Sequence, residues 1–157
     1  MAELTNDDLV ALLASAPDRL DAALAANTRQ EPAPQPGVTT GEGEWTTSEL
    51  VGHLCDAARY WGGRMRLVVY EDEPALPVYD QDTFVRLAAY RYVPAATLAR
   101  EFRLISEANV ALLRGLRPEA WQRGGRHEER GRLTLRALVE IEAEHEGDHV
   151  RQLASGH

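Results

Sequence analysis

Apolar residues near the C-terminus recur at helical spacing, and two histidines lie on the face that these residues form. His145 and His149 are four residues apart, so on a helix they lie one above the other on the same side. At roughly 100° per residue, that side also carries Leu135, Leu138, Ile141 and Leu153. Such a face packs against other elements, so both imidazoles are expected to point inward. Buried imidazoles without partners are costly, and either a shared cation or hydrogen bonds within the core would satisfy them.

Helix start signals recur along the rest of the chain. Thr5, Thr46 and Thr134 each precede a segment of apolar residues at helical spacing and can cap its first turn. Glu49, three residues after Thr46, completes a capping box. These signals predict helices that begin at or just after the three threonines.

The spacing of apolar residues predicts four long helices and a short one, over about 5–27, 46–70, 82–92, 94–115 and 134–154. Pro17 predicts a kink in the first helix, or a break with a restart near Ala16. No segment shows a convincing strand alternation. The sequence therefore predicts an all-α fold, an up-down four-helix bundle with one extra short helix.

The connections are rich in proline and glycine. Residues 30–44 can hold no regular element and predict either a mobile connection or a lid over a site. Residues 71–81 are expected to form a loop, and 117–127 an irregular segment with room for one helical turn at 118–121.

Length and charge narrow the classes of function. With 157 residues the chain is expected to form a single domain, 1–157. Its net charge of -8 argues against nucleic acid or an anionic membrane surface as a partner. The single cysteine, the lack of a signal peptide and the lack of a long apolar run favour a cytoplasmic protein that acts on a small molecule.

A catalytic metal site usually has three protein ligands and an open position, so a third ligand is needed. His53 has the inward register on a well-capped helix and is the best candidate. Asp56 beside it would either orient His53 or lie exposed. His127 lies in a Gly/Arg-rich loop that favours a surface role, and His157 is the final residue and is expected to fray.

A competing interpretation comes from the His145-Glu146-Gly147-Asp148-His149 segment, which matches the H-E-x-x-H motif of zinc peptidases. Those enzymes take a third ligand downstream of the motif, yet few residues follow His149 here. They also need a strand-containing domain before the helix. A zinc peptidase is therefore the less favoured alternative.

Three motifs in order resemble the DinB/YfiT-like superfamily: Trp-Thr-Thr-Ser-Glu-Leu-Val-Gly-His-Leu at 45–54, Gly-x-Leu-Thr-Leu at 131–135 and His-x-x-x-His-x-x-Gln-Leu at 145–153. The resemblance implies a four-helix bundle that binds a divalent metal ion, zinc or nickel, through His53, His145 and His149. It further implies homodimers and a metal-dependent hydrolase, or an S-transferase that uses a low-molecular-weight thiol of the bacillithiol or mycothiol type.

The resemblance and the helix register together suggest roles for other side chains. Glu142 falls on the inward face and is expected to act as general base, to orient a ligand, or to lie at the rim. Glu146, near the edge of that face, is a second catalytic candidate. Gln152 matches the family motif and is expected either to bind a cofactor by hydrogen bonding near the site or to pack between helices. Cys55 is expected to be structural. The alternative to an enzyme is a non-catalytic, metal-binding, stress-related protein of the same fold.

Overall fold

The first three long helices have nearly the bounds that the sequence predicts. In the computed structural model, which describes residues 3–27, 31 and 45–156, α1 spans Asn6–Ala26, α2 spans Thr47–Tyr70 and α4 spans Ala95–Arg114. The Thr46 hydroxyl accepts a hydrogen bond from the Glu49 amide while the Glu49 carboxylate accepts one from Thr46. The predicted capping box is therefore confirmed.

The proline in α1 does not break the helix. Residues Asn6–Ala26 are continuous through Pro17, so the expected break with a restart is wrong. Upstream of the proline, the Leu12 carbonyl accepts hydrogen bonds from the Ser15 hydroxyl at 2.9 Å and from the Arg19 guanidinium at 3.1 Å. The N–H that Pro17 lacks would have bonded to the Leu13 carbonyl, so α1 loses one backbone hydrogen bond there and still continues as one helix.

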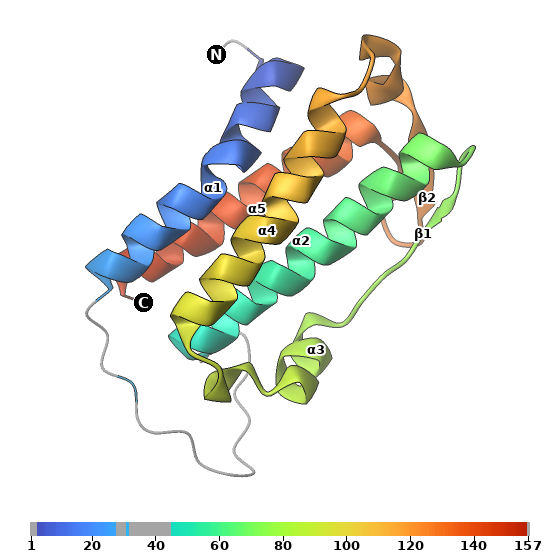
Figure 1. Cartoon of the computed structure of the whole chain (residues 1–157). Helices are drawn as coiled ribbons and strands as arrows, with labels where there is room; N and C mark the ends of the chain where they lie inside the picture. Colours follow the sequence, from blue (N-terminus) through green and yellow to red (C-terminus); the bar gives the residue numbers. More distant parts are fainter. Residues whose placement is uncertain (1–2, 28–30, 32–44, 157) are drawn as a thin grey trace.

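The last helix, α5 (Leu135–Ser155), begins after the cap Thr134, whose hydroxyl accepts a hydrogen bond from the Ala137 amide at 3.1 Å. Its predicted start is confirmed. It packs against both α1 and α2, while α4 packs on the other side of the same two helices. Figure 1 shows that α2 and α5 run in opposite directions, whereas α2 and α4 run in the same direction.

The all-α four-helix bundle with one extra short helix is thereby confirmed, although its long helices do not alternate strictly up and down as expected, because α2 and α4 run in the same direction. The long connection between α2 and α4 allows these two helices to run parallel (Figure 1). The extra helix, α3 (Gln81–Ala88), is shorter than expected. Ala89 adopts a left-handed conformation with φ of 54°, which ends α3, and a 3-10 helix, η2 (Tyr90–Tyr92), follows.

A small sheet corrects the expectation of a fold without strands. Strand β1 (Ala75–Leu76) lies in the predicted loop, and β2 (Gly124–His127) and β3 (Gly131–Thr134) lie beside the 3-10 helix η3 (Pro118–Gln122). The order is β1-β2-β3, with β1 parallel to β2 and β2 antiparallel to β3. Strands this short, rich in glycine and arginine, carry too few alternating positions for a sequence pattern.

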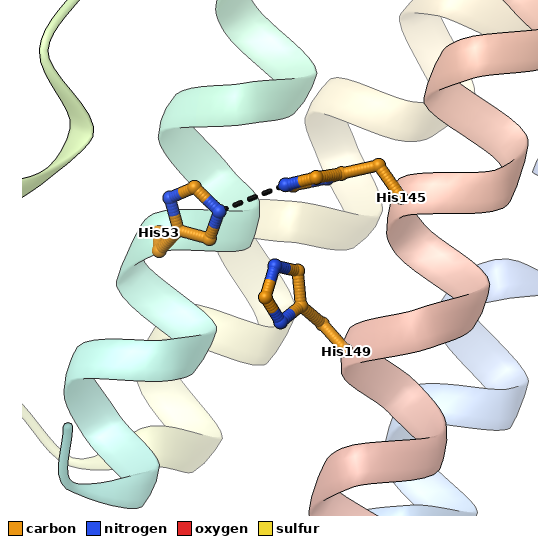
Figure 2. A group of neighbouring side chains, drawn as sticks. All are labelled: His53, His145 and His149. Carbon is orange, nitrogen blue, oxygen red and sulfur yellow. Dashed lines mark hydrogen bonds between the residues drawn. The ribbon is translucent and has the colours of Figure 1, made fainter. Parts of the chain in front are cut away.

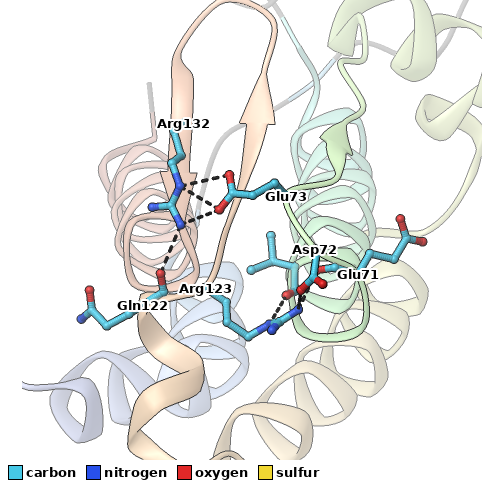
Figure 3. Close-up of polar contacts among 7 residues, drawn as sticks. Glu71, Asp72, Glu73, Gln122, Arg123 and Arg132 are labelled. Atoms are coloured by element: carbon cyan, nitrogen blue, oxygen red, sulfur yellow. Dashed lines mark hydrogen bonds and ion pairs between the residues drawn. The ribbon is translucent and has the colours of Figure 1, made fainter.

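Arginine side chains fasten this sheet to the end of α2 (Figure 3). Arg132 in β3 donates two hydrogen bonds to the Glu73 carboxylate from its Nε, at 2.9 and 3.0 Å, and one from Nη2 at 2.7 Å. Arg123 donates to the carbonyls of Val68 and Glu71 and to the Asp72 carboxylate, and Val68 lies in the last turns of α2. The connection after α2 is thus held against the segment before α5.

The interface between α2 and α4 depends on one glycine. A Cβ atom at Gly62 would lie 2.2 Å from the Asn109 amide oxygen, closer than atoms can approach. Asn109 is buried, donates to the Ala58 carbonyl at 2.9 Å and accepts from Arg66 at 2.7 Å. Because Gly62 has no side chain, the Asn109 side chain of α4 can contact the α2 backbone directly.

The proline-rich residues expected to form a mobile connection or lid lie almost entirely outside the described residues, as does His157. Within the described part of the chain, none of the helices combines the length and the apolar character needed to cross a membrane.

Candidate metal centre

Three histidines from two antiparallel helices converge inside the bundle. One ring nitrogen from each of His53, His145 and His149 lies within 4.8 Å of the others. The Nε2 atoms of His53 and His145 are 2.9 Å apart, and the three rings stand edge to face with centroids 4.5 to 4.9 Å apart. Figure 2 shows a nitrogen of each ring turned toward the space between α2 and α5. The structure thus brings together the three histidines that the sequence singled out.

Burial keeps two of these imidazoles neutral. His53 is 0% exposed, and burial followed by its two histidine neighbours lowers its pKa to about 2. Burial and then His149 lower the pKa of His145 to about 4. At neutral pH both rings therefore keep a lone pair, as a metal ligand must.

A glutamine one turn further along α5 fixes the third ring. His149 Nδ1 donates a hydrogen bond to the Gln152 side-chain oxygen at 3.0 Å. This bond places the proton on Nδ1 and leaves Nε2 as the lone-pair nitrogen. Gln152 was predicted to bind a cofactor, and its observed contact is with the histidine.

The arrangement suits a divalent cation. Tetrahedral coordination with Zn–N bonds of about 2.0–2.1 Å separates two ligand nitrogens by roughly 3.3 Å. The observed spacings of 2.9 Å and up to 4.8 Å bracket that value. The Nδ1 atoms of His53 and His145 are buried without a hydrogen-bond partner in the described residues, so these two rings have no orienting contact like that of His149 with Gln152. The donor set of three imidazoles fits zinc or nickel.

Trp45 forms a wall of the site that sequence reasoning missed. Its ring centroid lies 4.9 Å from that of His53, and the residue is 3% exposed. In the sequence, Trp45 stood out only as the first residue of the motif at 45–54. A residue preceding a helix cap can lie over the second turn of that helix, which is the signal that would have found it.

Two buried carboxyl groups lie on the same face of α5. Glu142 and Glu146 are each 2% exposed, so the expected edge position of Glu146 is wrong. Burial raises the pKa of both, and for Glu142 the neighbouring Glu146 raises it further. Arg64 from α2 and Arg19 from α1 act in the opposite direction on Glu142 and Glu146, respectively. Neither oxygen of Glu142 has a hydrogen-bond partner among the described residues.

The neighbours of His53 on α2 serve other contacts. Asp56 is 7% exposed and accepts hydrogen bonds from the Tyr90 hydroxyl at 2.7 Å and from Arg59 at 3.2 Å. Both expectations for Asp56, an exposed acid or an orienter of His53, are therefore wrong, because η2 brings Tyr90 onto it. Cys55 is buried with its thiol on the Leu98 carbonyl at 3.2 Å, consistent with the structural role expected.

The predicted surface role of His127 is also wrong. His127 is 5% exposed, because β2 places it opposite Leu76 of β1. Its Nδ1 accepts hydrogen bonds from the amides of Glu129 and Arg130 at 3.2 and 3.3 Å. It does not belong to the group of three converging histidines.

A solved structure and two curated proteins resemble this chain. The structure of YfiT from Bacillus subtilis, described as "a probable metal-dependent hydrolase with an unusual four-helix bundle topology", matches with a TM-score of 0.82. The match has 21% sequence identity and covers 99% of this chain and 87% of that one, and it shows the fold.

The two curated proteins, both from Oceanobacillus iheyensis, carry the names "Putative metal-dependent hydrolase OB0782" and "Putative metal-dependent hydrolase OB0413". They are 26% and 25% identical to this chain over 113 and 115 residues, which is 72% and 73% of its length. The matched region spans 65% and 66% of the length of these relatives.

The family model described as the DinB superfamily matches residues 2–153, which includes all three converging histidines, both buried glutamates and Gln152. The match runs through every helix of the bundle and agrees with the resemblance carried by the sequence motifs. The chain therefore belongs to the DinB superfamily.

Proposed function

We propose that this protein is a metal-dependent hydrolase of a small molecule, with His53, His145 and His149 as ligands of one divalent metal ion. The convergence of three buried ring nitrogens within 4.8 Å carries the proposal. The names of the curated relatives and the description of YfiT support it. Zinc and nickel are the favoured metals, because imidazole suits both.

With three protein ligands, a bound metal ion keeps an open position at which it lowers the pKa of water toward 7 or accepts the thiolate of a low-molecular-weight thiol. The residues of the chain prepare this position. Gln152 holds His149 with Nε2 inward, and Trp45 covers His53 from one side. Both contacts orient ligands and limit access of bulk water to the rings.

The buried glutamates are our candidates for proton transfer. Glu142 and Glu146 lie on the α5 face that carries the two histidines, and their raised pKa values suit groups that accept and return a proton. We assign Glu142 as the general base, because both of its oxygens lack hydrogen-bond partners in the described residues. Glu146 is then the neighbouring acid that helps to raise the pKa of Glu142.

This assignment differs from a zinc peptidase. His145, Glu146 and His149 supply the motif, but the third converging ring comes from His53, which precedes the motif in the chain. A peptidase takes that ligand from downstream and uses the motif glutamate at the metal. We therefore propose small esters and amides, rather than peptides, as substrates.

A panel of small esters and amides, assayed with protein that has been stripped with a chelator and reloaded with zinc or nickel, tests the proposal. We expect hydrolysis that depends on the metal and that is lost in His149→Ala and reduced in Glu142→Gln. Hydrolysis that persists without metal would contradict it.

A second arm adds bacillithiol, mycothiol or glutathione together with an electrophile. Turnover only in this arm would replace hydrolysis by thiol S-transfer at the same site. Stoichiometric metal without turnover in either arm would favour the non-catalytic, metal-binding alternative.

A further inference from the structure

Arg64, on α2, is a buried cation whose charge no acid of the described residues neutralises by direct contact. It is 3% exposed, the lowest value of any arginine that the structure describes. Its guanidinium lies over the ring of Trp61, 4.5 Å from the centroid. Burial lowers the pKa of Arg64, which shows that its surroundings offer less stabilisation than water does. A buried charge of this kind normally has a partner.

The hydrogen bonds of Arg64 leave one edge of the guanidinium free. Nε and Nη2 both donate to the Pro77 carbonyl, at 2.8 and 2.5 Å. A guanidinium has five N–H donors, so three remain, and they include the Nη1–Nη2 edge that forms the two parallel bonds to a carboxylate. Nη1 bonds to no described residue and is not among the fully buried unpartnered atoms, so it keeps some contact with water.

Other arginines of the same region are paired differently. Arg123 and Arg132, on either side of the sheet, each combine backbone carbonyls with a carboxylate, Asp72 and Glu73 respectively (Figure 3). Glu142 is an acid whose charge raises the pKa of Arg64, yet no ion pair joins the two among the described residues. Burial and Glu146 raise the pKa of Glu142, so it is a poor counter-ion. Among the described residues, Arg64 therefore has a carbonyl and an aromatic ring as contacts and no carboxylate.

Two further donors surround Arg64. His127 is paired in register with Leu76, the residue before Pro77, and its Nδ1 accepts two amide protons, so its own proton is on Nε2. Tyr79 stacks on Tyr60 with centroids 4.1 Å apart, and its hydroxyl bonds to no described residue. The Pro77 carbonyl that accepts from Arg64 directly follows Leu76, the register partner of His127, and precedes Tyr79 by two residues, so both donors lie near the Arg64 guanidinium. In keeping with this, Arg64 lowers the pKa of His127.

This group of donors lies on the side of α2 that faces the histidines. Arg64 follows His53 by eleven residues. At about 100° and 1.5 Å per residue, the two lie on nearly the same face with Cα atoms roughly 16 Å apart along the axis. On α5, Glu142 precedes His145 by about one turn and is buried, and its charge acts on Arg64. Because the arginine side chain is long, its guanidinium can lie closer to the His53 ring than the two Cα atoms do, at a separation that a small molecule can span.

We propose that Arg64 binds a carboxylate of the substrate through its free Nη1–Nη2 edge, with Tyr79 and His127 as neighbouring donors. The preferred substrates are then small esters or amides that carry a carboxylate at a distance from the bond to be hydrolysed. This substrate class rests on the proposed hydrolase function, whereas carboxylate binding at Arg64 does not.

The binding test uses the full chain, zinc-loaded and again after chelation, titrated with benzoate, with neutral benzamide of similar shape and with inorganic phosphate. We expect benzoate to bind with or without zinc, and benzamide and phosphate to bind more weakly. Arg64→Gln should weaken benzoate binding by about ten-fold or more, as loss of a charge-assisted pair does. Arg123→Gln, which removes a guanidinium with a similar backbone contact, should leave benzoate binding unchanged.

Arg64→Lys separates binding from a structural role. A lysine retains the charge and can reach the Pro77 carbonyl but lacks the planar fork, so benzoate should bind more weakly than to the wild type in a folded protein. A second measurement is made on the wild type: benzoate should shift the NMR signal of the Arg64 Nε–H. Arg64→Lys, in which that signal is absent, assigns it. Equal benzoate binding by wild type and Arg64→Gln, binding that requires zinc, or tighter binding of phosphate would overturn the proposal.

The two proposals fail separately. Metal-dependent hydrolysis of neutral esters without preference for carboxylate-bearing ones would refute the subsite and leave the hydrolase. Benzoate binding at Arg64 without hydrolysis of any ester or amide would refute the hydrolase and leave the subsite. In a working assay, Arg64→Gln should raise KM for carboxylate-bearing substrates and leave KM for neutral ones unchanged.

Discussion

Replacing Gln152 by leucine tests whether the hydrogen bond to His149 prepares that ring as a metal ligand. The substitution removes the acceptor 3.0 Å from Nδ1 while keeping a side chain of similar size. Loss of such an orienting partner typically weakens metal binding 10- to 100-fold. We expect about ten-fold, the lower end, because His53 and His145 also hold the His149 ring edge to face, with centroids 4.9 and 4.5 Å away.

The assay is competition for zinc against a chelator of known affinity. A ten-fold loss corresponds to about 1.4 kcal/mol of binding free energy. Gln152→Glu is the matched control, since its carboxylate still accepts the Nδ1 proton and should preserve or increase affinity. Binding of zinc by Gln152→Leu within two-fold of the wild type would refute the reasoning. So would a Gln152→Glu variant weaker than Gln152→Leu.

Three further predictions concern packing, a thiol and the metal. Gly62→Ala should destabilise the fold by about 1–3 kcal/mol, because its Cβ would lie 2.2 Å from Asn109. Gly63→Ala, whose Cβ would have nothing within 4 Å, should stabilise the fold by up to about 1 kcal/mol. Urea unfolding that changes the free energy of unfolding in the same direction for both variants would contradict this. Burial raises the pKa of Cys55 to about 12, so a thiol reagent at pH 8 should label it only after unfolding, and rapid labelling of the native protein would count against its burial. Zinc in excess should raise the melting temperature of the chelated wild type and not that of His149→Ala, and equal shifts would point to binding elsewhere.

The helices could be predicted because their signals are local. Thr46 and Glu49 satisfy each other within one turn, so the start of α2 follows from four consecutive residues. The histidine pair on α5 is local in the same sense, because its spacing fixes the face. His53 required a tertiary assumption, that α2 and α5 present these faces to each other, and the structure bears out that convergence.

The features that were missed depend on contacts between distant segments. Asp56 turns to Tyr90, thirty-four residues later, and β1 finds its partner in β2 across the whole of α3 and α4. Neither contact produces a periodic pattern in the sequence, so neither could be predicted from it. Arg64 gave no signal either, since an arginine on a helix is ordinarily exposed, and its contact with the Pro77 carbonyl joins segments that the sequence pattern does not link.

The metal content of the wild type and of His53→Ala, measured by elemental analysis after zinc loading and removal of excess, tests the central claim most directly. His127→Ala, which removes a buried histidine outside the converging group, is the matched control, and far-UV circular dichroism checks that each variant folds. A metal site that needs all three converging histidines should hold one zinc ion per chain in the wild type and in His127→Ala, and none in folded His53→Ala. A full complement of zinc in His53→Ala, or none in the wild type, would contradict it.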